Sequence, residues 1–163
     1  MATLASIEKI KSYDALDTEE LATKLLVRYI AEGTLWKMGE MFQLASSFNG
    51  NLSNWNVGKV TDMAYMFAGN ISFDQDLSSW DVSSVADMSR MFRMSLAKQN
   101  INISSWDVSN VTNMYAMFMN ADSFNQDISS WDVSAATDMP YVFYNAGSFN
   151  QDISSWDVSA AED

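Results

Sequence analysis

The sequence predicts an α/β solenoid in which every repeat of about 25 residues contributes one short parallel strand and one short helix. Three observations predict this fold class. A Trp-Asp-Val triplet, which is Trp-Asn-Val in its first copy, recurs at a nearly constant interval; a Met-x-x-Met-Phe segment recurs with the same period; and residues 1–33 do not repeat. The tryptophans of the triplet are Trp55, Trp80, Trp106, Trp131 and Trp156.

The strand is expected at the triplet. Side chains alternate between the two sides of a strand, so Trp131 and Val133 would face the core while Asp132 faces solvent. The tryptophan column is accordingly expected to form a packed structural ladder on the strands. An exposed strip of aromatic ligands is the less favoured alternative.

The helix is expected at the segment that contains the methionines. One copy places its apolar residues on a single helical face: Val111, Met114, Met117, Phe118 and Ala121. Most copies have an Asp or Asn immediately before the first Met, as a helix N-cap would require: Asp62, Asp87, Asn113 and Asp138. Since such a helix has only about two turns, it would depend on the neighbouring repeats for its stability.

The chain divides into an N-terminal helical cap, residues 1–33, and a repeat region, residues 34–163. The repeats are expected at about 34–54, 55–79, 80–105, 106–130 and 131–155, with a partial repeat at 156–163. Asp17 opens a capping-box-like start of the cap helix, and Gly33 ends it. One repeat has an extra residue and has Gln99 in place of a Phe, which predicts a bulge where Leu96 or Ile101 replaces the missing ring.

Composition excludes several classes of function. The chain has no Cys and no His, so it lacks thiol nucleophiles, histidine bases and zinc sites built on those ligands. Its net charge is −12 and no Lys or Arg follows Lys98, so it would repel nucleic acid and attract a protein with a basic patch. Its apolar runs are too short for membrane insertion. Because repeated carboxylates share one environment, they do not separate an acid from a base, and we expect neither an enzyme nor a cofactor.

The candidate ligand-binding residues are the outward aspartates of the triplet, Asp81, Asp107, Asp132 and Asp157, headed by Asn56. Equivalent residues on stacked strands lie roughly 4.8 Å apart. Such carboxylates repel one another, which favours binding of a cation or a basic partner. The alternative is structural: each Asp bonds to neighbouring Ser hydroxyls or turn amides and belongs to a solvated face.

Two further polar columns accompany the repeat. Asn125 and Asn150 belong to the first, with Asn49, Asp74 and Asn100, and are expected to form a structural ladder that satisfies turn backbone groups across repeats. The second column contains Asp76, Asp127 and Asp152, which are weak candidates for calcium ligands. Since no Gly-rich acidic loop accompanies them, structural roles in turns are favoured and no metal site is predicted.

The motifs Trp-Asp-Val-Ser-x-Val-x-x-Met-x-x-Met-Phe and Phe-Asn-Gln-Asp-Ile-Ser-Ser resemble those of the BspA-like leucine-rich-repeat surface proteins. This class, with repeats of similar length, occurs in mycoplasma lipoproteins, various bacteria and some protists. The resemblance covers residues 34–163. It implies a right-handed solenoid related to leucine-rich repeats, exposure at the cell surface or secretion, and a role in adhesion or protein binding. It supplies no catalytic residues to transfer.

We therefore expect a non-enzymatic protein-binding or adhesion module that presents an acidic strand face. The alternative is a structural subunit of a larger assembly, docked through the cap helix and the open C-terminal strand edge. Unpaired edges favour end-to-end self-association. The N-terminus lacks the basic and apolar regions of a signal peptide, so the sequence leaves the compartment open.

Overall fold

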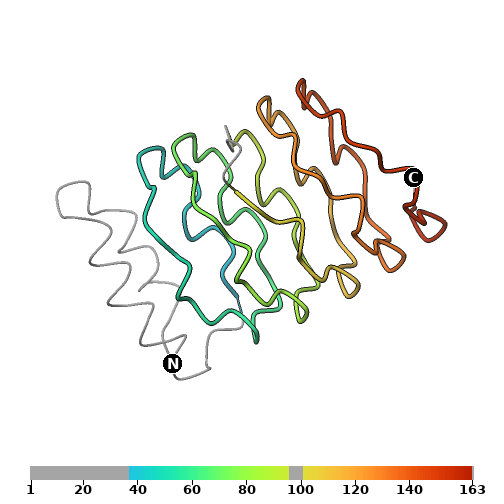
Figure 1. Ribbon diagram of the computed structural model, residues 1–163, viewed down its shortest axis with the longest axis horizontal. Helices are drawn as coiled ribbons and strands as arrows, with labels where there is room; N and C mark the ends of the chain where they lie inside the picture. Colours follow the sequence, from blue (N-terminus) through green and yellow to red (C-terminus); the bar gives the residue numbers. More distant parts are fainter. Residues whose placement is uncertain (1–36, 96–100, 163) are drawn as a thin grey trace.

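The computed structural model describes residues 37–95 and 101–162, which form a row of stacked repeats (Figure 1). The repeats follow one another in chain order along the long axis, and each consists of turns joined by irregular connecting pieces. The predicted cap and most of the predicted bulge around Gln99 lie outside the described residues. Ile101, which follows that bulge, is buried. Within the described part of the chain, no helix is long and apolar enough to span a bilayer.

The expected repeat of one helix and one strand is wrong. Residues 37–95 and 101–162 contain no α-helix, and their only β structure is a set of single-residue parallel bridges. The bridges join one position of successive repeats: Lys37, Asp62, Asp87, Asn113, Asp138 and Glu162. These findings overturn the α/β, leucine-rich-repeat-like solenoid, and the repeats form a stack of turns instead.

The methionine segment forms turns because its amides bond in two directions. Every second amide from Met63 to Gly69 donates to a carbonyl of the next repeat at 2.7–2.9 Å, as Tyr65 does to Ser89. Between them, the amide of Met66 donates to the carbonyl of Met63, three residues earlier. In a helix, the amides beyond the first turn would instead bond to carbonyls of the same segment, four residues back. Successive turns bring apolar residues to one side every three or four positions, which produced the helix-like spacing.

Left-handed backbone interrupts each of these segments twice. The pairs lie four residues apart, with φ between 53° and 69°: Glu40 and Leu44, Tyr65 and Gly69, Arg90 and Met94, Ala116 and Asn120, Tyr141 and Asn145. A left-handed residue cannot continue a right-handed helix, so each pair forces the chain to turn. A Cβ at Gly69 would lie 2.6 Å from Cδ2 of Leu44, so the exposed side chain of Leu44 would have to move if a larger residue stood there.

The Trp-Asp-Val triplet is not a strand either. None of the bridges in the described part of the chain involves it. They lie at the column expected to supply helix N-caps, whose Asp and Asn side chains bond as caps do: Asp87 Oδ1 accepts the N–H of Ser89 at 2.8 Å. Because the following residues turn toward the next repeat, the cap-like bond closes a turn and no helix begins.

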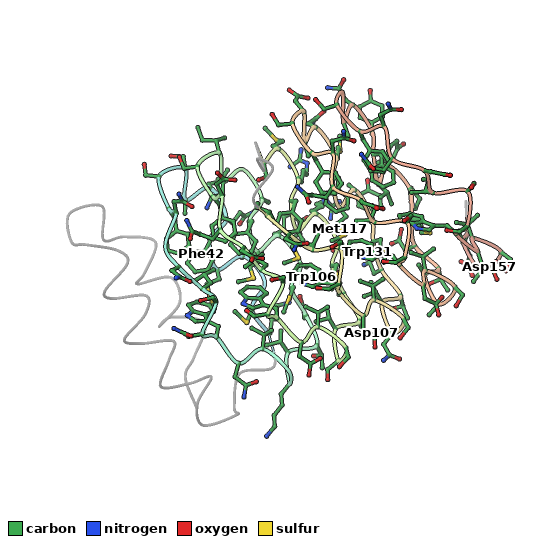
Figure 2. All side chains as sticks on the ribbon, viewed as in Figure 1. Phe42, Trp106, Asp107, Met117, Trp131 and Asp157 are labelled. Carbon is green, nitrogen blue, oxygen red and sulfur yellow. The ribbon has the colours of Figure 1, made fainter. Side chains whose placement is uncertain are left out.

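The core consists of columns of rings and methionines that run through the stack. Figure 2 shows Trp106, Met117 and Trp131 in the interior, with Asp107 and Asp157 at the periphery. Successive rings of the phenylalanine column that starts at Phe42 are 5.5–5.7 Å apart and nearly parallel. Successive tryptophan rings are 6.4–6.5 Å apart. Such stacking adds to the hydrophobic stabilisation from burying each ring.

The indoles of the later tryptophans also join their repeats to the preceding ones by hydrogen bonds, in Trp80, Trp106, Trp131 and Trp156. The indole N–H of Trp106 donates to the carbonyl of Leu77 at 3.0 Å, and that of Trp131 donates to Ile103 at 3.1 Å. The carbonyl of Leu77 also accepts the backbone N–H of Trp80 at 3.0 Å. One carbonyl therefore closes a turn in its own repeat and anchors the ring of the next.

We predict that Trp106→Phe lowers the free energy of unfolding by about 1–3 kcal/mol, because it removes this hydrogen bond and leaves a small void beside the ring. Urea unfolding followed by circular dichroism measures the change. Trp156→Phe is the matched control, since its indole makes the equivalent bond from a half-buried position. If the Trp106 variant lost no more stability than the control, the tryptophan column would not hold the interior repeats together.

Candidate functional site

The triplet aspartates form an exposed column that runs along the stack, with one aspartate in each of four repeats. In each of the four, Oδ1 accepts the backbone N–H of the Ser two residues later at 3.0–3.1 Å: Asp81, Asp107, Asp132 and Asp157. In the first three, the same oxygen also accepts the Ser hydroxyl at 2.6 Å. All four side chains are exposed. The column therefore has the turn bonds of the structural alternative and also presents its carboxylates to solvent.

Asn56 heads this column in the first repeat and closes the same kind of turn. Its Oδ1 accepts the N–H of Gly58 at 3.2 Å. A Cβ at Gly58 would lie 3.1 Å from Asp81 Oδ2, so this carboxylate lies directly against the preceding repeat. Asn can thus replace Asp in the turn without the charge, because only one side-chain oxygen is needed.

The serine bonds lower the pKa of three carboxylates of this column, Asp107, Asp132 and Asp157. The hydroxyl of Ser109 lowers the pKa of Asp107, with a smaller contribution from its amide, while the nearby charge of Asp132 acts in the opposite direction. Ser134 lowers the pKa of Asp132 in the same way, against the charge of Asp157. Asp107, Asp132 and Asp157 are therefore close enough for neighbouring carboxylates to repel one another, and the serine bonds outweigh the effect of that repulsion on the pKa of Asp107 and of Asp132.

The weak calcium candidates form a second exposed column with the same turn chemistry. Asp76, Asp127 and Asp152 accept the N–H of the Ser two residues later at 2.8–3.0 Å. Asn102 does the same with Ser104 at 3.3 Å. Among the described residues, no three acidic side chains gather closely enough to hold a metal ion. This column therefore adds negative charge to the surface without forming a chelating site.

The asparagine ladder bridges repeats from the surface. Asn125 Oδ1 accepts the backbone N–H of Asn150 at 2.8 Å and the side-chain amide of Gln151 at 3.0 Å. Asn49 makes the equivalent bonds to Asp74 and Gln75, both at 2.9 Å. Asn49, Asn125 and Asn150 are exposed. Among the described residues, the buried Asn is Asn70, whose Oδ1 accepts an amide of its own repeat and whose Nδ2 donates to the carbonyl of Phe48.

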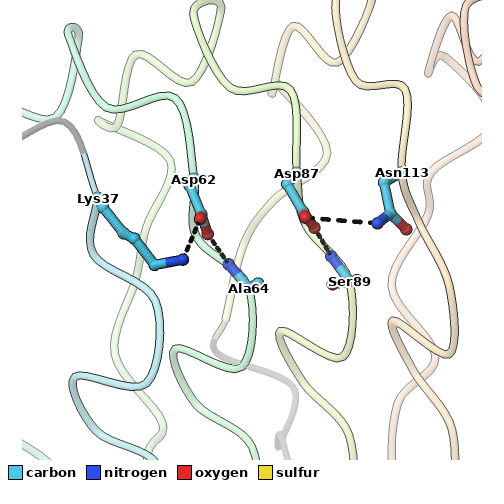
Figure 3. A network of polar contacts seen from close by, with 6 residues as sticks. All are labelled: Lys37, Asp62, Ala64, Asp87, Ser89 and Asn113. Atoms are coloured by element: carbon cyan, nitrogen blue, oxygen red, sulfur yellow. Dashed lines mark hydrogen bonds and ion pairs between the residues drawn. The ribbon is translucent and has the colours of Figure 1, made fainter.

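A third acidic column lies where the bridges are, and Figure 3 shows its polar network. Lys37 Nζ lies 2.6 Å from Asp62 Oδ2, and this hydrogen bond raises the pKa of Lys37. In the next pair of repeats, Asn113 Nδ2 donates to Asp87 Oδ2 at 3.3 Å. The charges of this column are therefore partly matched within the chain, unlike those of the triplet column.

Sequence reasoning missed a row of side chains that consists of four tyrosines and one arginine: Tyr65, Arg90, Tyr115, Tyr141 and Tyr144. The guanidinium of Arg90 lies 5.0 Å from the ring of Tyr65 and 4.3 Å from that of Tyr115. Tyr115 contacts Tyr141 edge-on at 5.8 Å, and Tyr141 contacts Tyr144 at 5.7 Å. Tyr65, Arg90 and Tyr141 share one column of the repeat with Glu40 and Ala116, so that column has no aromatic consensus. Tyr115 and Tyr144 lie in two other columns, and periodicity therefore does not reveal the row. Large side chains that depart from the repeat consensus are the signal that could have found them.

A family model described as "Mycoplasma protein of unknown function, DUF285" matches the chain twice, over residues 31–102 and 94–163. The two matches agree with a sequence built from repeats. No curated protein and no solved structure matches the chain.

We predict that Ser134→Ala raises the pKa of Asp132, because the hydroxyl bond at 2.6 Å is lost while the amide bond remains. Carboxyl NMR titration measures this pKa. The folded-state pKa of Asp132 lies below the unfolded one, so its contribution to stability is present above about pH 4 and is lost as the pH falls through the folded value. Acid unfolding should therefore be less steep in the variant.

Ser130→Ala is the control for this titration, since the Ser130 hydroxyl donates to the carbonyl of Ser104 at 3.1 Å instead of to a carboxylate. It should leave the pKa of Asp132 unchanged. Equal pKa values for Asp132 in the wild type and in the Ser134 variant would show that the hydroxyl does not hold the charge.

Proposed function

The chain belongs to the family described as Mycoplasma protein of unknown function, DUF285, and we propose that it is a non-enzymatic module that binds a basic protein partner. The observation that carries this proposal is the exposed triplet column of Asp81, Asp107, Asp132 and Asp157. Its carboxylates are oriented by serine turns and are repeated along the stack.

Charge distribution supports a basic partner. The described residues from 101 to 162 include aspartates of two exposed columns and neither Lys nor Arg. Their repulsion is relieved when lysine or arginine side chains of another protein approach. Each exposed ion pair contributes only about 0–1 kcal/mol, so affinity must come from several repeats acting together. Binding should then weaken steeply with added salt.

The resemblance to BspA-like surface proteins supports a finer version of the proposal, in which the module acts in adhesion at a cell surface. In that setting, a regular column of charges would engage a partner whose basic residues are spread along an extended surface. Docking through the cap helix and the C-terminal edge, as a subunit of an assembly, stays the alternative prediction.

We predict that replacing Asp81, Asp107, Asp132 and Asp157 by Asn weakens binding of a fluorescent octalysine peptide about tenfold or more at low salt, as four modest ion pairs would. Asn56 and Asn102 already close such turns in this chain. The variant should therefore keep the turns and lose only the four charges. Fluorescence anisotropy measures the binding.

The matched control removes four exposed charges elsewhere, by replacing Asp76, Asp122, Asp127 and Asp152 with Asn. We expect a smaller loss in this variant. Equal losses would mean that net charge alone attracts the peptide, and unchanged binding in the first variant would mean that the triplet column is not the binding surface.

A further inference from the structure

The asparagine ladder contains one residue pair that is chemically unlike its equivalents. Asn49 is followed by Gly50, and this is the only Asn-Gly pair in the sequence. In the other repeats whose ladder residue is described, the position of Gly50 is occupied by glutamine: Gln75, Gln126 and Gln151. In an Asn-Gly pair the backbone nitrogen of Gly can attack the side-chain carbonyl carbon of Asn, because Gly has no Cβ that hinders the approach.

The side-chain oxygen of Asn49 already accepts two hydrogen bonds from the next repeat. The backbone N–H of Asp74 donates to Oδ1 at 2.9 Å, and Nε2 of Gln75 donates to the same oxygen at 2.9 Å. When a nucleophile adds to the carbonyl carbon, this oxygen gains negative charge. Donors that are in place beforehand stabilise such a charge, as those of an oxyanion hole do. The stack therefore assists the addition step.

The nucleophile and the leaving group are not held by competing bonds. Within the part of the chain that the structure describes, neither the backbone N–H of Gly50 nor Nδ2 of Asn49 takes part in a hydrogen bond. The side chain of Asn49 is exposed, so an amine that leaves it enters water directly.

We propose that Asn49 is a site of spontaneous deamidation, promoted by the following repeat, with water as the only co-reactant. The nitrogen of Gly50 gives its proton to solvent and bonds to Cγ of Asn49. The Cγ–Nδ2 bond then breaks, and Nδ2 takes up a proton and leaves as ammonia. Water opens the resulting cyclic imide at one of its two carbonyls, which gives aspartate or isoaspartate. The net reaction consumes one water, releases one ammonia and replaces an amide by a carboxylate.

The two products have different consequences for the fold. The equivalent of Asn49 in the next repeat is Asp74, so the ladder already accepts a carboxylate, and an aspartate still has an oxygen for the N–H of Asp74. Isoaspartate adds a carbon to the main chain between the buried side chains of Phe48 and Leu52, which displaces one of them. The aspartate product therefore adds a surface charge, while the isoaspartate product destabilises this repeat.

The experiment incubates the folded protein at mildly alkaline pH and follows deamidation by peptide mass spectrometry. Trypsin releases the relevant stretch as residues 38–59. We expect conversion at Asn49 and none at Asn125, whose Oδ1 accepts the equivalent two bonds but which is followed by Gln126. The same incubation in guanidinium chloride gives the rate of the unfolded chain. Slower conversion of Asn49 in the folded protein than in the unfolded chain would overturn the proposal, because the ladder would then protect the residue.

Two reciprocal variants separate the residue pair from its surroundings. Gly50→Gln should slow conversion of Asn49 about tenfold or more, because a side chain now hinders the attacking nitrogen. Among the described glycines, left-handed backbone is found at Gly69, so the φ of Gly50 does not require glycine. Gln126→Gly should create a second site at Asn125. Absence of conversion there, or an unchanged rate in the first variant, would contradict the proposed chemistry.

A third variant tests the contribution of the next repeat. Gln75→Met keeps the length of the side chain and removes one of the two donors to Asn49 Oδ1. Conversion of Asn49 should become several-fold slower in the folded protein and stay unchanged in guanidinium chloride. An unchanged rate in the folded variant would show that the next repeat does not promote the reaction.

Discussion

The rest of the structure depends on the backbone hydrogen bonds that the amides of one repeat donate to the carbonyls of the next. Tyr65 donates to Ser89, Arg90 to Tyr115 and Phe118 to Val142, all at 2.9 Å. Each repeat is too short and too rich in turns to satisfy its own backbone, and buried amides without partners are costly. The turns therefore form only when the repeats stack, because stacking supplies the missing hydrogen-bond partners. Each repeat is stabilised mainly by its neighbours.

The stacking explains why chemistry appears in columns. A carboxylate that closes a turn in one repeat is brought next to its equivalent in the following repeat, so Asp107 and Asp132 each feel the charge of the next aspartate. The turn chemistry keeps these groups ionised, and the fold collects them on one surface. The triplet aspartates are among the groups that the turns leave exposed, and we propose them as the binding surface.

The repeat period could be predicted from the sequence, because the tryptophans recur with the spacing of the stacked units. The helix could not be distinguished from successive turns by apolar spacing, since Met114, Met117 and Phe118 reach one side in either case. The recurrence of Gly69, Asn120 and Asn145 at one position was the available signal for left-handed backbone. The acidic residues were found because they recur in fixed columns, but the tyrosine row has no consensus residue in its columns. Only the three-dimensional stack shows that Arg90 lies between the rings of Tyr65 and Tyr115.

The central claim is that the methionine segment bonds across repeats, and NMR couplings through hydrogen bonds test it most directly. The account predicts a coupling between the amide nitrogen of Phe118 and the carbonyl carbon of Val142, which lies in the next repeat. A coupling from Phe118 to the carbonyl carbon of Met114, four residues back, would show a helix and would contradict the account.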